Sequence, residues 1–208
     1  MVQKATTATK GPGRRPSFDR AAVVSAVTYV FWEKGFAATT LSDLEEATGV
    51  DRSTLYNSFD GKKGIYRAAT AAYVAGAGET MFEPLQAGVK GLEDIVDFLA
   101  MLDNNLRTKG QPRGCLIVND MASNSDHEAR ANYLEMLQAG FRAALGRAAA
   151  AGEIDVATVS RRSHLLTAAI LGINLAHRES ARTASAQVLL SGVRAEVQSW
   201  SALSIDSQ

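Results

Sequence analysis

Apolar residues recur every three or four positions along most of this chain, the spacing that places them on one face of an α-helix. Between about residues 18 and 34 the apolar stripe consists of Ala22, Ala26, Val27, Val30 and Phe31. Comparable patterns and helix-ending signals predict further helices over about residues 41–48, 52–59, 62–83, 93–106, 115–122, 126–151, 155–176 and 183–203. No segment alternates with period two for long enough to indicate a strand. The pattern therefore predicts an all-α protein with about nine helices.

Residues 39–66 carry the most specific local signals. Thr40 followed by Asp43 has the form of a capping box, which predicts a helix that begins directly after Thr40. Gly49 can supply the left-handed conformation that ends this helix. Asp51 is then placed to cap the next helix. The segment is therefore predicted to form two short helices joined by a glycine turn.

The second of these helices has few side chains that favour burial. Leu55 and Phe59 lie four residues apart and anchor one face, whereas the remaining positions are mostly polar. In a helix-turn-helix protein such a helix enters the major groove of DNA, where its side chains reach base edges while flanking groups hold phosphates. Lys62 opens the following helix, where backbone N–H groups can meet a phosphate. The candidate DNA contacts are Thr40, Arg52, Ser53, Thr54, Tyr56, Asn57 and Lys62.

The run from Val23 to Tyr66 resembles the DNA-binding domain of the TetR (tetracycline-repressor-like) family of bacterial regulators. The matching features are Phe31, Lys34-Gly35-Phe36, Thr39-Thr40, Ala47-x-Gly49-Val50, Thr54-Leu55-Tyr56, Phe59 and Lys62. Asp51 stands where Ser is commoner in the family, and Lys63 where an acidic residue is usual. Because these departures lie close to the recognition helix, the resemblance does not identify the operator sequence.

The resemblance implies a domain organisation and a function. A helix-turn-helix domain is expected over residues 17–76, followed over residues 77–208 by a regulatory and dimerisation domain. The implied function is that of a homodimeric repressor that binds a palindromic operator in double-stranded DNA and is released by a small-molecule effector. An activator, or a regulator that does not respond to a ligand, stays open as an alternative. A redox or electrophile sensor acting through Cys115 is a further alternative.

The charge is distributed unevenly although the formal net charge is zero. Residues 1–70 contain ten Lys/Arg and seven Asp/Glu, whereas residues 71–208 contain twelve and fifteen. This separation is expected if only the N-terminal part contacts phosphates. Residues 1–16 are interpreted as a flexible, solvated basic tail. Within it, Arg14 and Arg15 are close enough to the first helix to reach the DNA backbone or minor groove.

The last two long helices each have a broad apolar face. Leu165 lies on the first of these faces and Val188 on the second. These faces fit either an ordinary intrachain core or a four-helix bundle between two copies of the chain. The second interpretation is the one that the resemblance implies, because two recognition helices are needed to read a palindrome. The candidate dimerisation residues are Leu166, Ile170, Ile173, Leu189, Val193, Val197 and Trp200.

The C-terminal part contains many aromatic and methionine side chains, which suit an adaptable apolar pocket but also an ordinary core. Asn and His side chains there are candidates for orienting a ligand, although each is equally suited to capping backbone groups. The candidate ligand-binding residues are Phe98, Met101, Leu102, Cys115, Asn119, Tyr133, Phe141, Asn174 and His177. No cofactor is expected.

Cys115 is the only cysteine, so no intrachain disulfide is possible and a reducing cytoplasm is expected. Its place at the predicted start of a short helix, beside Arg113, would favour the thiolate. A small buried hydrophobe is the simpler interpretation of the same residue. One cysteine and three scattered histidines form no recognisable metal site.

Several classes of protein are disfavoured by what the sequence lacks. No phosphate-loop, dinucleotide-binding, G-x-S-x-G or metal-helix motif is present, so an enzyme is not expected. No apolar run approaches the eighteen or so residues that cross a bilayer, and the basic N-terminus lacks the apolar region of a secretory signal. A cytoplasmic protein without a membrane partner is therefore expected.

Overall fold

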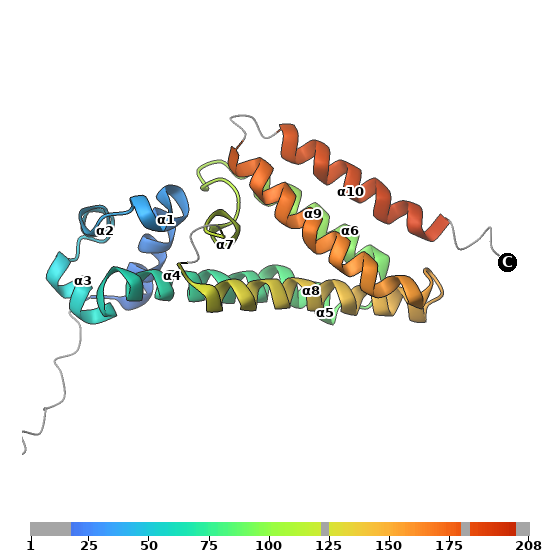
Figure 1. Ribbon diagram of the computed structural model, residues 1–208, viewed down its shortest axis with the longest axis horizontal. Helices are drawn as coiled ribbons and strands as arrows, with labels where there is room; N and C mark the ends of the chain where they lie inside the picture. Colours follow the sequence, from blue (N-terminus) through green and yellow to red (C-terminus); the bar gives the residue numbers. More distant parts are fainter. Residues whose placement is uncertain (1–17, 122–124, 180–183, 203–208) are drawn as a thin grey trace, which may run out of the picture.

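The computed structural model describes residues 18–121, 125–179 and 184–202, and all regular structure within these ranges is helical (Figure 1). The α-helices are α1 (Arg20–Ala38), α2 (Leu41–Thr48), α3 (Arg52–Phe59), α4 (Gly61–Ala77), α5 (Glu83–Ala87), α6 (Leu92–Arg107), α7 (Leu116–Asn119), α8 (His127–Ala150), α9 (Val159–Glu179) and α10 (Ala184–Ala202). A π-helix, η1 (Gly78–Phe82), joins α4 to α5, and a 3₁₀-helix, η2 (Val156–Thr158), precedes α9. The all-α prediction is confirmed.

The buried side chains form two clusters. The first packs helices α1, α2, α3 and α4 against one another. It includes Val27, Phe31, Leu44 and Leu55, each with no exposed surface. The second and larger cluster joins the remaining helices and also includes Val74 of α4. Burying one such side chain contributes roughly 1.5–3 kcal/mol of apolar transfer free energy. Leu116 of α7 belongs to the first cluster, so a residue far along the chain helps to hold the N-terminal helices.

The segments α4, η1 and α5 follow one another without interruption and connect the two clusters. In Figure 1 this rod runs alongside α8, with which α4, η1 and α5 are all in contact. The rod extends to Ala87, so the predicted helix end near residue 83 is wrong. Pro84 lies in the first turn of α5, where a missing N–H is tolerated, and the wide π-turn comes immediately before it.

Two other boundaries differ from the sequence prediction, and a third agrees with it in part. The short helix predicted over 115–122 is confined to Leu116–Asn119, with Cys115 as its N-cap. The helix predicted from residue 155 begins as η2, which Asp155 caps, and its α-helical part extends to Glu179. The first helix was expected to stop at Gly35, and the backbone there is indeed non-helical, with φ 78° and ψ 163°.

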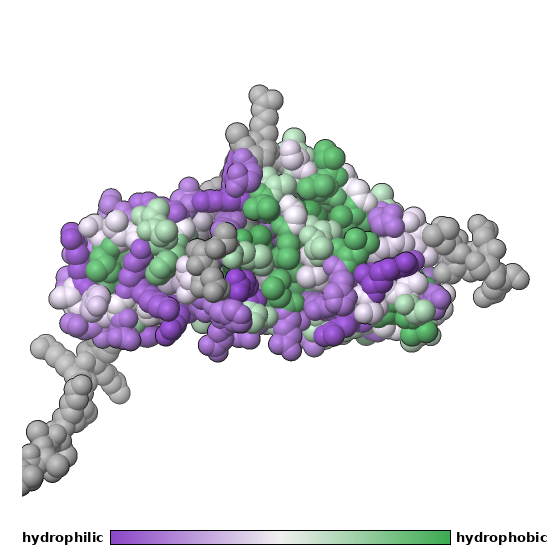
Figure 2. Space-filling model, viewed as in Figure 1, coloured by the Kyte–Doolittle hydropathy of each residue, from purple (hydrophilic) through white to green (hydrophobic). Residues whose placement is uncertain are grey.

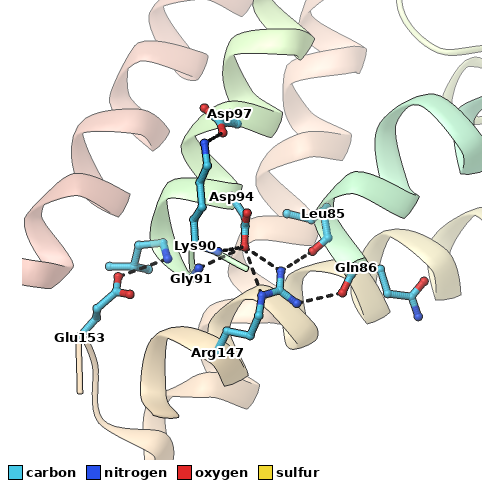
Figure 3. Close-up of polar contacts among 9 residues, drawn as sticks. Leu85, Gln86, Lys90, Gly91, Asp94, Asp97, Arg147 and Glu153 are labelled. Atoms are coloured by element: carbon cyan, nitrogen blue, oxygen red, sulfur yellow. Dashed lines mark hydrogen bonds and ion pairs between the residues drawn. The ribbon is translucent and has the colours of Figure 1, made fainter. Parts of the chain in front are cut away.

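The turn between α5 and α6 is fixed by a cluster of polar contacts around Asp94 and Arg147 (Figure 3). Nη2 of Arg147 donates to Oδ2 of Asp94 at 2.8 Å and to the Leu85 carbonyl at 2.7 Å. The same carboxylate accepts backbone N–H groups from Lys90 and Gly91 at 2.9 and 3.1 Å. The cluster therefore joins α5, α6 and α8 at one point.

Candidate DNA-binding surface and interdomain cavity

Helix α2 begins with the predicted capping box. The Asp43 backbone N–H donates to Oγ1 of Thr40 at 3.2 Å, and the Thr40 N–H donates to Oδ2 of Asp43 at 2.7 Å. Lys34 forms a 2.8 Å ion pair with the same carboxylate. Hydrogen bonds from Lys34 and then Thr40 lower the pKa of Asp43 to about 2. Thr40 is exposed at the helix start, and its hydroxyl is engaged in this cap.

Helix α3 is anchored through one face only. Leu55 is fully buried and Phe59 is 6% exposed, whereas Arg52, Tyr56 and Asn57 are exposed. The outer face of this helix is therefore available to a partner. This arrangement is the one expected of a recognition helix.

Asp51 caps α3 and holds two of the candidate DNA contacts. Its carboxylate accepts hydrogen bonds from the hydroxyls of Ser53 and Thr54, each at 2.6 Å, and from the Thr54 backbone N–H at 2.9 Å. These contacts, Ser53 first, lower the pKa of Asp51 to about 2. Because both hydroxyl hydrogens are engaged, Ser53 and Thr54 offer DNA only their acceptor lone pairs in this arrangement.

The remaining candidates on α3 are less constrained. Arg52 forms a 2.6 Å ion pair with Glu45 of α2, and both side chains are substantially exposed. An exposed pair of this kind contributes about 0–1 kcal/mol, so the guanidinium can exchange Glu45 for a phosphate at little cost. Asn57 makes no side-chain hydrogen bond to any residue that the structure describes. Tyr56 is 54% exposed.

Lys62 lies in the first turn of α4, as predicted, although the helix itself begins at Gly61. Its ammonium lies 4.6 Å from the centroid of the Phe36 ring and 3.5 Å from the Ala37 carbonyl oxygen. The other two candidate contacts, Arg14 and Arg15, lie outside the described residues.

Gly64 is a functional position that the sequence reasoning missed. A Cβ atom built there would collide with the backbone carbonyl oxygen of Phe59, the last residue of α3. Only glycine therefore allows α4 to pass so close to the end of α3. The signal that could have indicated this close approach is a glycine in the first turn of a helix that follows an Asp-Gly turn.

A cavity of about 470 Å³ lies between the N-terminal helices and the larger cluster. Its walls come from α1, α4, η1, α6, α8, α9 and the segment before α7. Six of the nine candidate ligand-binding residues line it, namely Phe98, Leu102, Cys115, Tyr133, Asn174 and His177. The sequence did not indicate that Trp32 of α1 and Tyr73 of α4 also form its walls.

The other three candidates do not line this cavity. Phe141 is fully buried and packs edge-on against Phe98, with ring centroids 5.3 Å apart. The side-chain amide of Asn119 donates to the Arg113 carbonyl at 2.8 Å. Met101 is partly exposed on α6. Periodicity places these residues on helices correctly but does not say on which side of a helix the cavity opens.

Cys115 is 2% exposed and packs in the larger cluster. Two tyrosines of the cavity wall are near its thiol. Burial and, second, the charged form of Cys115 raise the pKa of Tyr73 and of Tyr133 well above the usual value. The thiol is thus enclosed by two neutral phenols.

The apolar faces of α9 and α10 point in two directions. Five candidate dimerisation residues, Leu166, Ile170, Ile173, Val197 and Trp200, are at most 4% exposed and pack within the chain's own core, so their assignment to an intermolecular contact is corrected. Leu189 is 47% exposed and Val193 is partly buried. The outward face instead contains Leu165, Leu175, Val188 and Leu189, and hydrophobic residues gather over these two helices in Figure 2.

Comparison with known proteins identifies the family. The family described as "Bacterial regulatory proteins, tetR family" matches residues 24–69. The HTH-type transcriptional repressor ComR of Escherichia coli (strain K12) is 32% identical over 179 residues, which cover 83% of this chain and 85% of ComR. This chain belongs to the TetR family. It is a transcriptional regulator.

One further relative and two solved structures extend this comparison. The uncharacterised regulator YezE of Bacillus subtilis (strain 168) is 30% identical over 148 residues, covering 69% of this chain and 76% of YezE. A cysteine-substituted CifR complexed with double-strand operator DNA has a TM-score of 0.75 at 22% identity, covering 90% of this chain and all of that one. The reduced form of Escherichia coli NemR has a TM-score of 0.71 at 20% identity, covering 84% of this chain and 94% of the NemR chain. These two structures share the fold.

The described residues contain no helix that combines the length and the apolar character needed to cross a bilayer. They also contain no group of three or more His, Cys, Asp or Glu side chains arranged to hold a metal ion.

Proposed function

We propose that this TetR-family regulator is a homodimeric repressor that binds a palindromic operator and is released by a small-molecule effector. The observation that carries the proposal is the orientation of α3, whose two apolar anchors are buried while Arg52, Tyr56 and Asn57 face outward. In this assignment Arg52 and Asn57 reach base edges or nearby phosphates. Thr40, Tyr56 and Lys62 hold the DNA backbone. Ser53 and Thr54 accept hydrogen bonds from base amino groups.

The exposed face of α9 and α10 supports the dimer. Leu165, Ala168, Gly172 and Leu175 are exposed at spacings of three and four residues, so they form one stripe along α9. A Cβ atom at Gly172 would meet nothing within 4 Å, which leaves room for a second helix to approach closely. A two-fold axis through this face would place two α3 helices for two half-sites about 34–36 Å apart.

Two connections support coupling between effector and DNA. The rod of α4, η1 and α5 forms part of the cavity wall and carries α3 at its N-terminus. Helix α1 is also tied to the larger cluster, because the Tyr29 hydroxyl donates to the Gly110 carbonyl at 3.0 Å and Arg178 donates to the Glu33 carbonyl at 2.9 Å. Such coupling is typically about 1–3 kcal/mol, or 5–150-fold in affinity.

The proposed domain boundaries, 17–76 and 77–208, follow the two buried clusters, although Val74 packs in the larger cluster and Leu116 in the smaller one. Both domains would act in the cytoplasm, where the operator lies. The described chain and its relatives offer no support for catalysis, and a non-enzymatic role is part of the proposal.

The proposal is tested by selecting bound sequences from a random pool of double-stranded DNA with the purified full chain. The expected product is an inverted repeat whose half-sites are about one helical turn apart. Recovery of a single half-site, or of no enriched sequence, contradicts the dimeric repressor. Fusion of the recovered site to a promoter then distinguishes a repressor from an activator.

Cys115 supports a second candidate, a redox or electrophile sensor, because the thiol lines the cavity. In this alternative an electrophile that enters the cavity would alkylate the sulfur and weaken operator binding. Treatment of native protein and a Cys115→Ser variant with N-ethylmaleimide tests it. Loss of DNA binding in the native chain alone supports the sensor, and equal retention in both excludes it.

A further inference from the structure

The interdomain cavity has an unusual chemical character for its size. None of its lining residues is Asp, Glu, Lys or Arg. His177, the lining residue that could become charged near neutral pH, accepts a hydrogen bond at Nδ1 from the Gly114 backbone N–H at 2.9 Å. Burial, and then the nearby Arg113, lower the pKa of His177 from its usual value of 6.5. The walls are therefore neutral at physiological pH.

A charged ligand would be poorly accommodated in such a cavity. Moving a charge from water into a site without a compensating charge costs far more than one hydrogen bond returns. A neutral ligand avoids this cost and gains from contact with the aromatic and aliphatic walls. The lining residues therefore offer no charged side chain to pair with an organic acid or amine.

Most polar groups on the walls already have partners within the chain. Thr80 donates to the Gly76 carbonyl at 2.7 Å, and Thr108 donates to the Asn104 carbonyl at 3.0 Å. The Asn174 amide donates to the Ile170 carbonyl at 2.9 Å. These bonds hold the walls and reduce the number of groups that remain for a ligand.

Trp32 differs from these residues. Its indole nitrogen is buried and has no hydrogen-bond partner among the residues that the structure describes. Indole N–H is only a donor, and a buried unpaired donor costs about 1–3 kcal/mol. The Trp32 ring packs edge-on against Tyr73, with centroids 5.1 Å apart. Because Trp32 also lines the cavity, an acceptor on a bound ligand is a candidate partner for this nitrogen.

We propose that the cavity takes an uncharged, largely apolar ligand carrying a hydrogen-bond acceptor, and that Trp32 contacts this ligand directly. The inference rests on the proposed effector response. It adds a chemical class of effector, and it adds a contact from α1, which belongs to the DNA-binding helices. Ligand binding then acts on α1 directly as well as through the α4 rod.

The chain allows this contact to be observed without DNA, because it contains only two tryptophans. Trp200 donates to Glu196 at 2.9 Å on α10 and does not line the cavity. A Trp200→Phe variant therefore reports on Trp32 alone, and the matched Trp32→Phe variant reports on Trp200. Circular dichroism and thermal unfolding establish that both variants are folded.

The probes are three aliphatic molecules of similar length: methyl heptyl ketone, nonanoate and octylammonium. The ketone is expected to bind saturably and to change the emission of Trp200→Phe but not of Trp32→Phe. The acid and the amine are expected to bind at least about tenfold more weakly, because of their charge. Calorimetry on the native chain gives the same order of affinities independently of either variant.

Trp32→Phe should lower the ketone affinity by about fivefold, the size of one neutral hydrogen bond, while leaving an aromatic ring in place. Absence of saturable ketone binding, equal or tighter binding of a charged probe, or binding without a change in Trp32 emission each overturns the inference. Operator release is measured separately. A ketone that binds beside Trp32 without releasing DNA leaves this assignment intact and contradicts the proposed repressor mechanism.

Discussion

The recognition helix and the interdomain cavity are organised in opposite ways. The polar groups of α3 are held by neighbours along the chain, as when Asp51 accepts from Ser53 and Thr54. The cavity is assembled from residues as far apart as Trp32 and His177, and its walls carry no Asp, Glu, Lys or Arg. The α3 surface is exposed and held by contacts between residues close in sequence, whereas the cavity has no charged side chain in its walls and is built from residues far apart in sequence.

This difference predicts how each surface responds to change. A substitution on the outer face of α3 alters one exposed contact and leaves the fold intact, so DNA preference can change residue by residue. A substitution in the cavity changes contacts with several helices at once.

The largest effect is expected at the outward face of α9. Replacing Leu165 and Leu175 by Glu should raise the dimer dissociation constant by about 100-fold or more, because two-fold symmetry counts each lost apolar contact twice. Sedimentation velocity at a series of concentrations measures this constant. Val89→Glu is the control, since Val89 is 86% exposed and lies in the connection between α5 and α6. Unchanged dimerisation in the double variant would mean that the chain associates elsewhere.

Removal of the Asp94 carboxylate is expected to be the most destabilising single change in the larger cluster. Asp94→Ala should cost about 3 kcal/mol in the free energy of unfolding, because it leaves the partly buried Arg147 without its partner. Asp97→Ala removes an exposed ion pair with Lys90 and should cost at most about 1 kcal/mol. Urea unfolding compares the two variants. Equal costs would contradict the structural role given to Asp94.

Substitution of Gly64 tests how closely α3 and α4 pack, again by comparison with a matched control variant. Replacing a glycine in a helix by alanine usually stabilises it by about 0.5–1 kcal/mol, which is the result expected for Gly146→Ala, where the new Cβ meets nothing within 4 Å. Gly64→Ala should instead destabilise by about 2 kcal/mol, because the Cβ collides with the Phe59 carbonyl. The Gly64→Ala variant should also bind its operator less tightly than the native chain. Stabilisation by both substitutions would show that α3 and α4 are less closely packed.

The smallest effect concerns pH. The pKa values of Asp43 and Asp51 are lowered from 3.8 to about 2 in the folded chain. A lowered carboxyl pKa contributes stability that is fully present above pH 3.8 and is lost as the pH falls towards 2. Helices α2 and α3 should therefore lose protection below pH 4, whereas neither group changes stability between pH 5 and 8. Asp51→Asn, followed by hydrogen exchange, should show a weaker acid dependence; an identical one would contradict the assignment.

The N-terminal helices could be predicted closely from the sequence because their signals are local. The Thr40–Asp43 box, the left-handed Gly49 and the Asp51 cap each depend on residues within four positions, and all three are present in the structure. Gly64 was missed because its constraint comes from α3 packing against α4. That constraint appears only when both helices are in place.

The C-terminal helices show what could not be predicted from the sequence. Periodicity identified the apolar helices α9 and α10, but not which side faces the chain's own core, so Leu166 and Ile170 were assigned outward although they are buried. Trp32 was not considered for the cavity because it lies in the DNA-binding segment, over forty positions before Tyr73 and far from most other walls. Both outcomes are set by long-range packing.

The most direct test of the central claim is fluorescence anisotropy of the full chain with the intergenic DNA beside its own gene, across a range of salt concentrations. The account predicts tight, sequence-selective binding that weakens steeply with salt and is lost in an Arg52→Ala/Asn57→Ala variant that remains folded. Binding that is insensitive to salt, or unaffected by the two substitutions, would contradict the assignment of α3 as the DNA-reading helix.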